Sequence, residues 1–108
     1  MAEDPPVELS VEATTEDGVP VLIVRGELDA YSAPTLDSAI ETALEHGASQ
    51  LVLDLAEVGF IDSSGLRSMI RARKQIGDDP DALRIRNPQP GTVRLLEITG
   101  LTGHFPEA

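Results

Sequence analysis

The chain has 108 residues, of which 41% are hydrophobic, so it can build one packed core but is too short to divide into two. It contains no cysteine, which excludes disulfides, thiolate metal sites and cysteine nucleophiles. Its 19 acidic and 8 basic residues give a net charge of −11, which argues against direct binding to nucleic acid or to an anionic membrane.

The N-terminal residues 1–6 are acidic and interrupted by two prolines, unlike a signal peptide. No apolar run approaches the roughly 18 residues that would suggest a membrane span. We therefore expect a cytoplasmic protein without membrane association, in which residues 1–6 form a flexible tail ahead of a single domain.

The first two predicted elements form an antiparallel hairpin. Apolar and polar residues alternate over 7–13, which predicts a half-buried strand. Asp17 and Gly18 follow, a pair that favours the positive φ angles of a tight reversal. The apolar run over 19–25 then predicts a second strand, antiparallel to the first and ended by Gly26.

A helix and a buried strand come next. Ser32 and Pro34 are typical of a helix start, and apolar residues recur at helical spacing until Gly47. Residues 51–55 are almost entirely apolar, as in a parallel strand that is buried on both faces. We expect a loop containing Gly59 and Phe60 to follow.

The remaining elements complete an alternating pattern. A second amphipathic helix is predicted from 62–65 to Gly77, a fourth strand over 83–86 and a third helix over 92–99, and the last few residues look loosely held. The order β-β-α-β-α-β-α predicts an α/β domain with one mixed, mostly parallel four-stranded sheet, an antiparallel N-terminal hairpin and about three helices.

A hydrolase site is the first enzymatic alternative. Ser63 and Ser64 lie between a strand and a helix, where an α/β hydrolase holds its nucleophile. The nucleophile elbow needs glycine two residues before and two after the serine, and the earlier position is not glycine. The two histidines, His46 at a helix end and His104 near the C-terminus, are poorly placed as bases. We therefore expect no enzymatic activity.

Asp54 raises a second alternative, a phosphorylated receiver domain, because it ends a predicted parallel strand. Such a site needs a further acidic pair to hold Mg²⁺, and the first strand offers only Glu12. Asp54 is better interpreted as a strand-end residue that bonds the following loop. The nucleotide-binding glycine motifs are absent and the carboxylates are scattered, so we expect neither a cofactor nor a metal site.

The start of the second helix remains as a candidate site. Asp62, Ser63 and Ser64 are all good N-cap residues, so one of them could serve only to cap the helix. The same geometry would also expose a hydroxyl. A phosphate attached there would face unpaired backbone N–H groups and the positive end of the helix dipole.

Three segments of the sequence, Gly26–Asp29, Leu51–Leu55 and Phe60–Leu66, resemble the STAS domain of anti-sigma factor antagonists. The resemblance covers roughly residues 7–105 with the same order of elements, and 99–101 also matches a segment typical of the family. The run Asp62–Leu66, which follows a buried strand, is its most specific part.

The resemblance implies a phosphorylation switch in transcription control. The serine after the aspartate, here Ser63, would be the phospho-acceptor, and the anti-sigma factor would be the serine kinase that modifies it. The unphosphorylated protein would sequester that kinase and free the sigma factor, the phosphorylated form would release it, and a serine phosphatase would reset Ser63.

The resemblance also assigns partner-binding residues. Asp29 matches an acidic residue near the acceptor loop, although it could equally cap that loop. The other expected contacts are Asp62, directly before the acceptor, and five residues after it: Ser64, Gly65, Arg67, Arg71 and Lys74. Arg67, Arg71 and Lys74 recur at i, i+4 and i+7 on the helix face away from the apolar residues. The ordinary interpretation of such a face is that it is solvated. Gly65 could be purely structural, and Arg67 stands where the family commonly has small residues.

Two other roles of the same domain stay open: a scaffold subunit of a membrane lipid or anion transporter, and a subunit of a stressosome. The intact run Asp62–Leu66 favours the antagonist.

Overall fold

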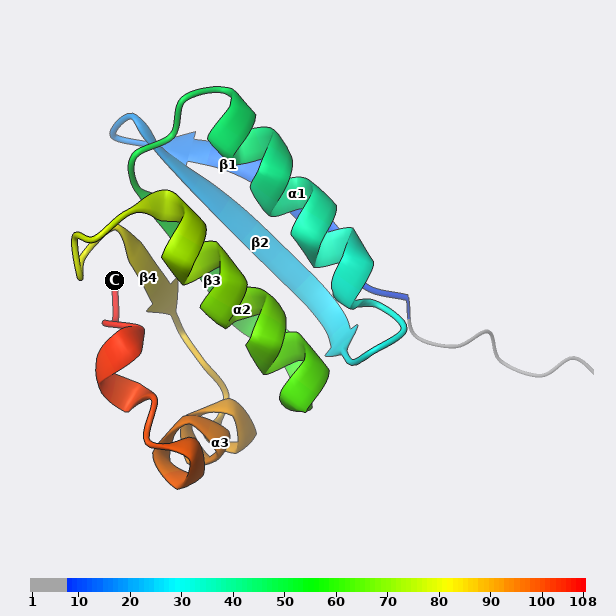
Figure 1. Cartoon of the computed structure of the whole chain (residues 1–108). Coiled ribbons are helices and arrows are strands. Elements are labelled where there is room, and N and C mark those ends of the chain that lie inside the picture. The colour runs from blue at the N-terminus through cyan, green and yellow to red at the C-terminus, as the bar shows by residue number, and fades with distance from the viewer. Residues whose placement is uncertain (1–7) are drawn as a thin grey trace, which may run out of the picture.

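The computed structural model describes residues 8–108; the predicted tail over 1–6 and Val7 lie outside the described residues. The elements, drawn in Figure 1, are β1 (Ser10–Glu16), β2 (Val19–Leu28), α1 (Ala33–Glu45), β3 (Leu51–Ile61), α2 (Ser63–Ile76), β4 (Leu83–Arg86), α3 (Pro90–Thr99) and a short 3-10 helix (Thr102–His104).

The four strands form one mixed sheet in the order β1-β2-β3-β4. β1 and β2 are antiparallel, whereas β2 with β3 and β3 with β4 are parallel. Figure 1 shows α1 and α2 side by side over one face of the sheet, while α3 lies beyond the carboxyl end of β4. The predicted fold class is confirmed. None of the helices in residues 8–108 has the length and apolarity that a membrane span needs.

The hairpin turns through two residues. Glu16 pairs directly with Val19, and Asp17 and Gly18 between them have φ angles of 52° and 81°. The reversal predicted at Asp17 and Gly18 is therefore confirmed, since this turn requires positive φ at both positions. The first strand was predicted over 7–13, three residues earlier than β1. So tight a turn lets the pairing with β2 continue to Glu16.

Both parallel strands run further than predicted. β2 passes through Gly26 to Leu28, and β3 continues to Ile61, so the predicted loop at Gly59 and Phe60 is wrong. The pairing of β2 with β3 shifts register twice beyond Ile23. Each shift breaks the two-residue alternation of buried and exposed side chains, which hides the strand from a periodicity argument. The extension carries the ends of β2 and β3 to the same edge of the sheet.

The hydrophobic core lies between the sheet and the helix pair. Buried side chains come from β2, β3, β4 and both helices of this layer: Leu22, Val24, Leu28, Leu36, Ile40, Leu51, Leu53, Leu55, Leu66, Met69, Ala72, Leu83 and Ile85. Burying one large aliphatic side chain stabilises a fold by about 1.5–3 kcal/mol. This packing fixes where α2 begins relative to the ends of β2 and β3.

Ion pairs connect the strands on the face of the sheet opposite α1 and α2. Arg25 lies 3.3 Å from Glu12 and 2.8 Å from Glu57, so it links three strands. Arg86 on β4 reaches Glu16 at the end of β1, at 2.9 Å. The carboxylates that look scattered in the sequence are thus partly gathered into cross-strand pairs.

Asp54 was predicted to end a strand, but it lies inside β3. Its Oδ1 accepts a hydrogen bond from Ala56 N at 3.0 Å, and its Oδ2 lies 3.6 Å from Arg86 Nε. Asp54 does accept a hydrogen bond from the backbone just after it, but that backbone belongs to the strand, so the expected bond to a following loop is wrong.

The C-terminal residues are held against β4, contrary to the expectation that they are loose. Ile85 N donates to Pro106 O at 2.9 Å, and Ala108 N donates to Ile85 O at 2.7 Å. Phe105 is 2% exposed. One buried aromatic ring and two backbone hydrogen bonds are sufficient to anchor this short segment.

Candidate functional site

Two loops meet at the carboxyl end of the parallel strands: residues 29–32 between β2 and α1, and Asp62 between β3 and α2. Asp62 N donates to Leu28 O at 3.1 Å and so ties the loops together. A Cβ atom at Gly65 would lie 2.6 Å from Leu28 Cγ and 2.9 Å from Leu28 O. Only glycine permits this approach, so Gly65 has a structural role in bringing the two loops into contact.

Asp62 is the N-cap of α2. Its backbone is extended, and its Oδ1 accepts hydrogen bonds from Ser64 N at 2.8 Å and from Gly65 N at 3.1 Å. The expectation that a phosphate here would face unpaired N–H groups is therefore wrong for these two donors. The aspartate carboxylate already occupies the place that an anion would take at this helix start.

Ser63 is the first residue of α2 and is exposed, whereas Ser64 is half-buried. The hydroxyl of Ser63 makes no hydrogen bond with any residue in the described range 8–108. Because Asp62 performs the capping, the Ser63 side chain is not needed for it. The hydroxyl is therefore accessible to a second protein.

Asp29 organises the neighbouring loop. Its Oδ1 accepts hydrogen bonds from Ser32 N at 2.9 Å and from Tyr31 N at 3.0 Å. The Ser32 hydroxyl donates to Glu27 O at 2.7 Å and accepts from Asp29 N at 3.0 Å. The backbone N–H of Ser32, more than its hydroxyl or Tyr31 N, lowers the pKa of the Asp29 carboxyl. Asp29 thus fits the loop-capping interpretation, and half-burial leaves part of it at the surface.

The basic side chains of α2 lie on its solvent side. Arg67, Arg71 and Lys74 are all exposed, as their spacing predicts. Arg71 Nη1 forms an ion pair with Asp37 Oδ2 of α1 at 3.1 Å, with 52% of the arginine side chain exposed. An exposed pair of this kind contributes at most about 1 kcal/mol. Arg71 therefore differs from Arg67 and Lys74, which have no ion-pair partner in the described residues.

Two exposed aromatic residues near the site were not singled out from the sequence. Tyr31, in the loop that Asp29 caps, is 91% exposed, and Phe60, close to the end of β3, is 51% exposed. The available signal was their position, because Tyr31 lies two residues after the segment Gly26–Asp29 and Phe60 begins the segment Phe60–Leu66. Phe60 was missed because the register shifts in β3 obscure which face its side chain occupies.

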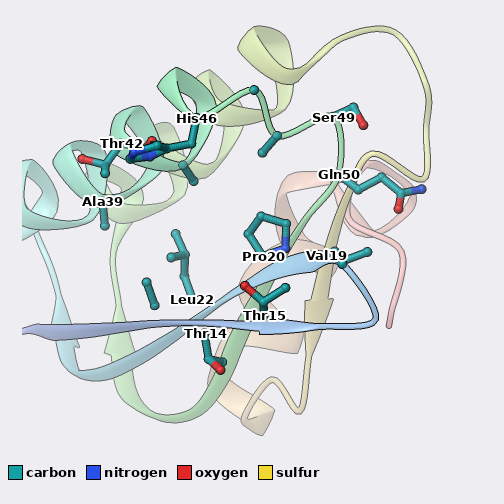
Figure 2. Close-up of a pocket in the computed structure, with 15 residues that line it drawn as sticks. Thr14, Thr15, Val19, Pro20, Leu22, Ala39, Thr42, His46, Ser49 and Gln50 are labelled. Carbon is teal, nitrogen blue, oxygen red and sulfur yellow. The ribbon is translucent and has the colours of Figure 1, made fainter.

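A pocket of about 510 Å³ lies at the other end of the strands, between the hairpin and α1. Figure 2 shows Thr15, Pro20 and Leu22 on one side and His46 on the other. His46 is the one titratable side chain among its described lining residues, and its Nδ1 lies 2.8 Å from Thr42 O. In residues 8–108 no group of three or more His, Cys, Asp or Glu side chains is placed to hold a metal ion.

Comparisons with known proteins give a consistent result. The STAS domain family model matches residues 10–107. The anti-sigma-B factor antagonist of Staphylococcus aureus (strain NCTC 8325 / PS 47) is 32% identical over 95 residues, which cover 88% of each chain. The crystal structure of an anti-sigma factor antagonist from Mycobacterium paratuberculosis has a TM-score of 0.86 and 30% identity, covering 97% of this chain and 89% of that one. The Bacillus cell fate determinant SpoIIAA in its phosphorylated form shares the fold, with a TM-score of 0.67 and 23% identity over 93% of this chain and 90% of its own.

Proposed function

The chain belongs to the STAS domain family, and from this we propose that it is an anti-sigma factor antagonist controlled by phosphorylation of Ser63. The unphosphorylated protein binds and sequesters an anti-sigma factor kinase in the cytoplasm and thereby frees a sigma factor. The observation that carries the proposal is the exposed, unbonded hydroxyl of Ser63, next to an aspartate that caps the helix in its place. The names of the relatives at 30% and 32% identity support the antagonist role.

The switch is electrostatic. A phosphate on Ser63 would carry about two negative charges at neutral pH. Because the N–H groups of Ser64 and Gly65 already bond Asp62, they do not neutralise those charges. The phosphate stays at the surface beside a carboxylate, where repulsion and the cost of removing water weaken a close contact with the kinase. A serine phosphatase restores the binding form, and the chain needs no cofactor and performs no catalysis.

The contact surface surrounds Ser63. Asp29, Asp62, Ser64 and Gly65 form the two-loop end of the sheet, and Arg67, Arg71 and Lys74 extend the surface along α2. Arg67 and Lys74 are the basic residues most available to a partner, since Arg71 is paired with Asp37.

Phosphorylation is tested with the kinase itself. The unphosphorylated protein is used to capture its partner from a lysate of the source bacterium, and the purified partner is then incubated with it and Mg²⁺-ATP. Peptide mapping is expected to find one phosphate, on Ser63. Ser63→Ala should bind the kinase as the wild type does and resist modification, and Ser63→Glu should bind more weakly. Ser64→Ala is the matched control and should be modified normally.

A phosphate found elsewhere, or equal kinase affinity for the phosphorylated and unphosphorylated proteins, would contradict the switch. Capture of a membrane permease or of a very large assembly in place of a kinase would favour the transporter or stressosome role.

The basic face of α2 is tested by charge reversal. Arg67→Glu should weaken kinase binding while changing the free energy of unfolding by no more than about 0.5 kcal/mol, because Arg67 is exposed and has no ion-pair partner in residues 8–108. Arg84→Glu makes the same change of charge as a control, because Arg84 alternates on β4 with the core residues Leu83 and Ile85 and so lies on the sheet face opposite α2. Calorimetric titration compares the two variants. Equal kinase affinity of the two variants would mean that Arg67 is only a solvated residue and does not contact the kinase.

A further inference from the structure

The outer edge of β3 is only partly paired. β4 pairs with β3 from Leu51 to Asp54, but β3 continues to Ile61. On the side where β4 stops, the described chain supplies α3 and the side chain of Gln89, whose Nε2 donates to Ala56 O at 2.8 Å. An open strand edge presents backbone N–H and C=O groups that can pair with another chain.

A groove of about 280 Å³ runs along this edge. One wall consists of four consecutive residues of β3, Val58–Ile61, and the other includes Leu95 and Ile98 of α3. Gly59 is one of these four residues and has no side chain, so the groove touches the backbone of the strand there as well as the side chains on either side.

Large exposed hydrophobic side chains line the groove. Three large hydrophobic residues are exposed in the described chain, and two of them, Phe60 at 51% and Ile98 at 72%, line this groove. Large apolar side chains that gather in an exposed groove mark a contact with another molecule. An occupant with a bulky apolar side chain would remove both from water.

The charge of the groove favours an acidic occupant from a different protein. Arg94 is the one charged side chain among the described lining residues, in a chain whose net charge is −11. A carboxylate on the occupant would pair with Arg94. A second copy of this chain would bring another −11 and be repelled overall.

We propose that an extended segment of the anti-sigma factor adds as a strand to the outer edge of β3, with an apolar side chain between Phe60 and Ile98 and a carboxylate against Arg94. This rests on the proposed function and identifies a second contact surface. β3 leads through Asp62 directly into Ser63, so the added strand would lie next to the phosphorylated residue. Backbone pairing supplies affinity in this mode of recognition, and the apolar groove supplies specificity.

The test uses the full chain and the purified anti-sigma factor that phosphorylates Ser63. Ile98→Gln removes the branched apolar side chain from a helix surface, and Arg94→Glu reverses the charge of the groove. Each should weaken binding about tenfold or more in a calorimetric titration, as expected for a residue central to an interface. Glu97→Gln, the neighbouring residue of α3 outside the groove, should change affinity less than about twofold. Hydrogen exchange of the complex should show new protection of amides within 58–61.

The outcomes separate this inference from the proposed function. If the anti-sigma factor binds and phosphorylates the wild type, but Ile98→Gln and Arg94→Glu bind equally well and amides 58–61 gain no protection, the groove is not the contact and the switch stands. Weaker binding without that protection overturns strand addition. A wild-type dimer that Ile98→Gln dissociates, seen by sedimentation, would identify a second copy as the occupant and overturn the proposal. A wild type that no anti-sigma factor binds refutes the proposed function and this inference with it.

Discussion

Two serines stand at the starts of neighbouring helices, and they differ in burial and in hydrogen bonding. Ser32, before α1, is 9% exposed, and its hydroxyl donates to Glu27 O and accepts from Asp29 N. Ser63, at the start of α2, is exposed and its hydroxyl bonds nothing in residues 8–108. Both follow a strand of the same parallel pair. The contrast shows that the hydroxyl of a serine at a helix start can either hold the local structure together by hydrogen bonds or remain unbonded and exposed.

The position of the preceding aspartate accounts for the difference. Asp29 stands three residues before Ser32, and the loop folds so that the backbone N–H of each residue donates to the side chain of the other. Asp62 stands directly before Ser63, and its carboxylate alone accepts hydrogen bonds from the N–H groups of Ser64 and Gly65. The aspartate completes the cap, so the hydroxyl of Ser63 is left outside it.

The largest expected effect comes from forcing the two loops apart. Gly65→Ala would place a methyl group 2.9 Å from Leu28 O, a backbone atom, so the chain must shift. We expect a loss of about 1–3 kcal/mol in the free energy of unfolding, as for other overpacked sites. Gly91→Ala in α3 meets nothing within 4 Å and should be neutral or stabilise by up to about 1 kcal/mol. Denaturant titration measures both, and equal stability of the two variants would mean that the loops are not tightly packed.

The serines themselves should differ by a similar or smaller amount. Ser32→Ala leaves Glu27 O and Asp29 N without their partner in a partly buried loop, which costs about 1–3 kcal/mol. Ser63→Ala removes an exposed hydroxyl and should change stability by less than about 0.5 kcal/mol. Thermal melts of both variants make the comparison. A loss at Ser63 as large as that at Ser32 would show that Ser63 is itself a cap.

The smallest effect is a pH dependence of the loop that Asp29 caps. Hydrogen bonds from Ser32 and Tyr31 hold the pKa of Asp29 below its ordinary value, so ionised Asp29 favours the folded state. This contribution is complete above the ordinary aspartate pKa of about 3.9 and is lost as the pH falls through the lower folded-state pKa. The stability advantage of the wild type over Asp29→Asn should therefore be greatest near neutral pH and shrink in acid. Asp78→Asn, at an exposed position, controls for net charge; an advantage independent of pH would contradict the assignment.

The sequence alone determined the order and type of the elements and the residue types of the candidate site, but not where the first three strands end. Hydrophobic periodicity placed the helices and the fourth strand, because regular spacing of apolar residues reflects burial on one face. The Asp17-Gly18 turn followed from local backbone preferences. Asp62 and Ser63 were identified because their residue types suit a helix start, and that preference is also local.

The tertiary structure alone decided which of these residues are bonded and which are free. The register shifts that extend β3 to Ile61 depend on its pairing with β2, a strand from a distant part of the chain. The position of Asp62 against the end of β2 depends on its backbone hydrogen bond to Leu28 O and on the close approach of Gly65 to Leu28. A hydrogen bond or a steric limit between residues far apart in sequence has no period, so no pattern along the chain could predict it.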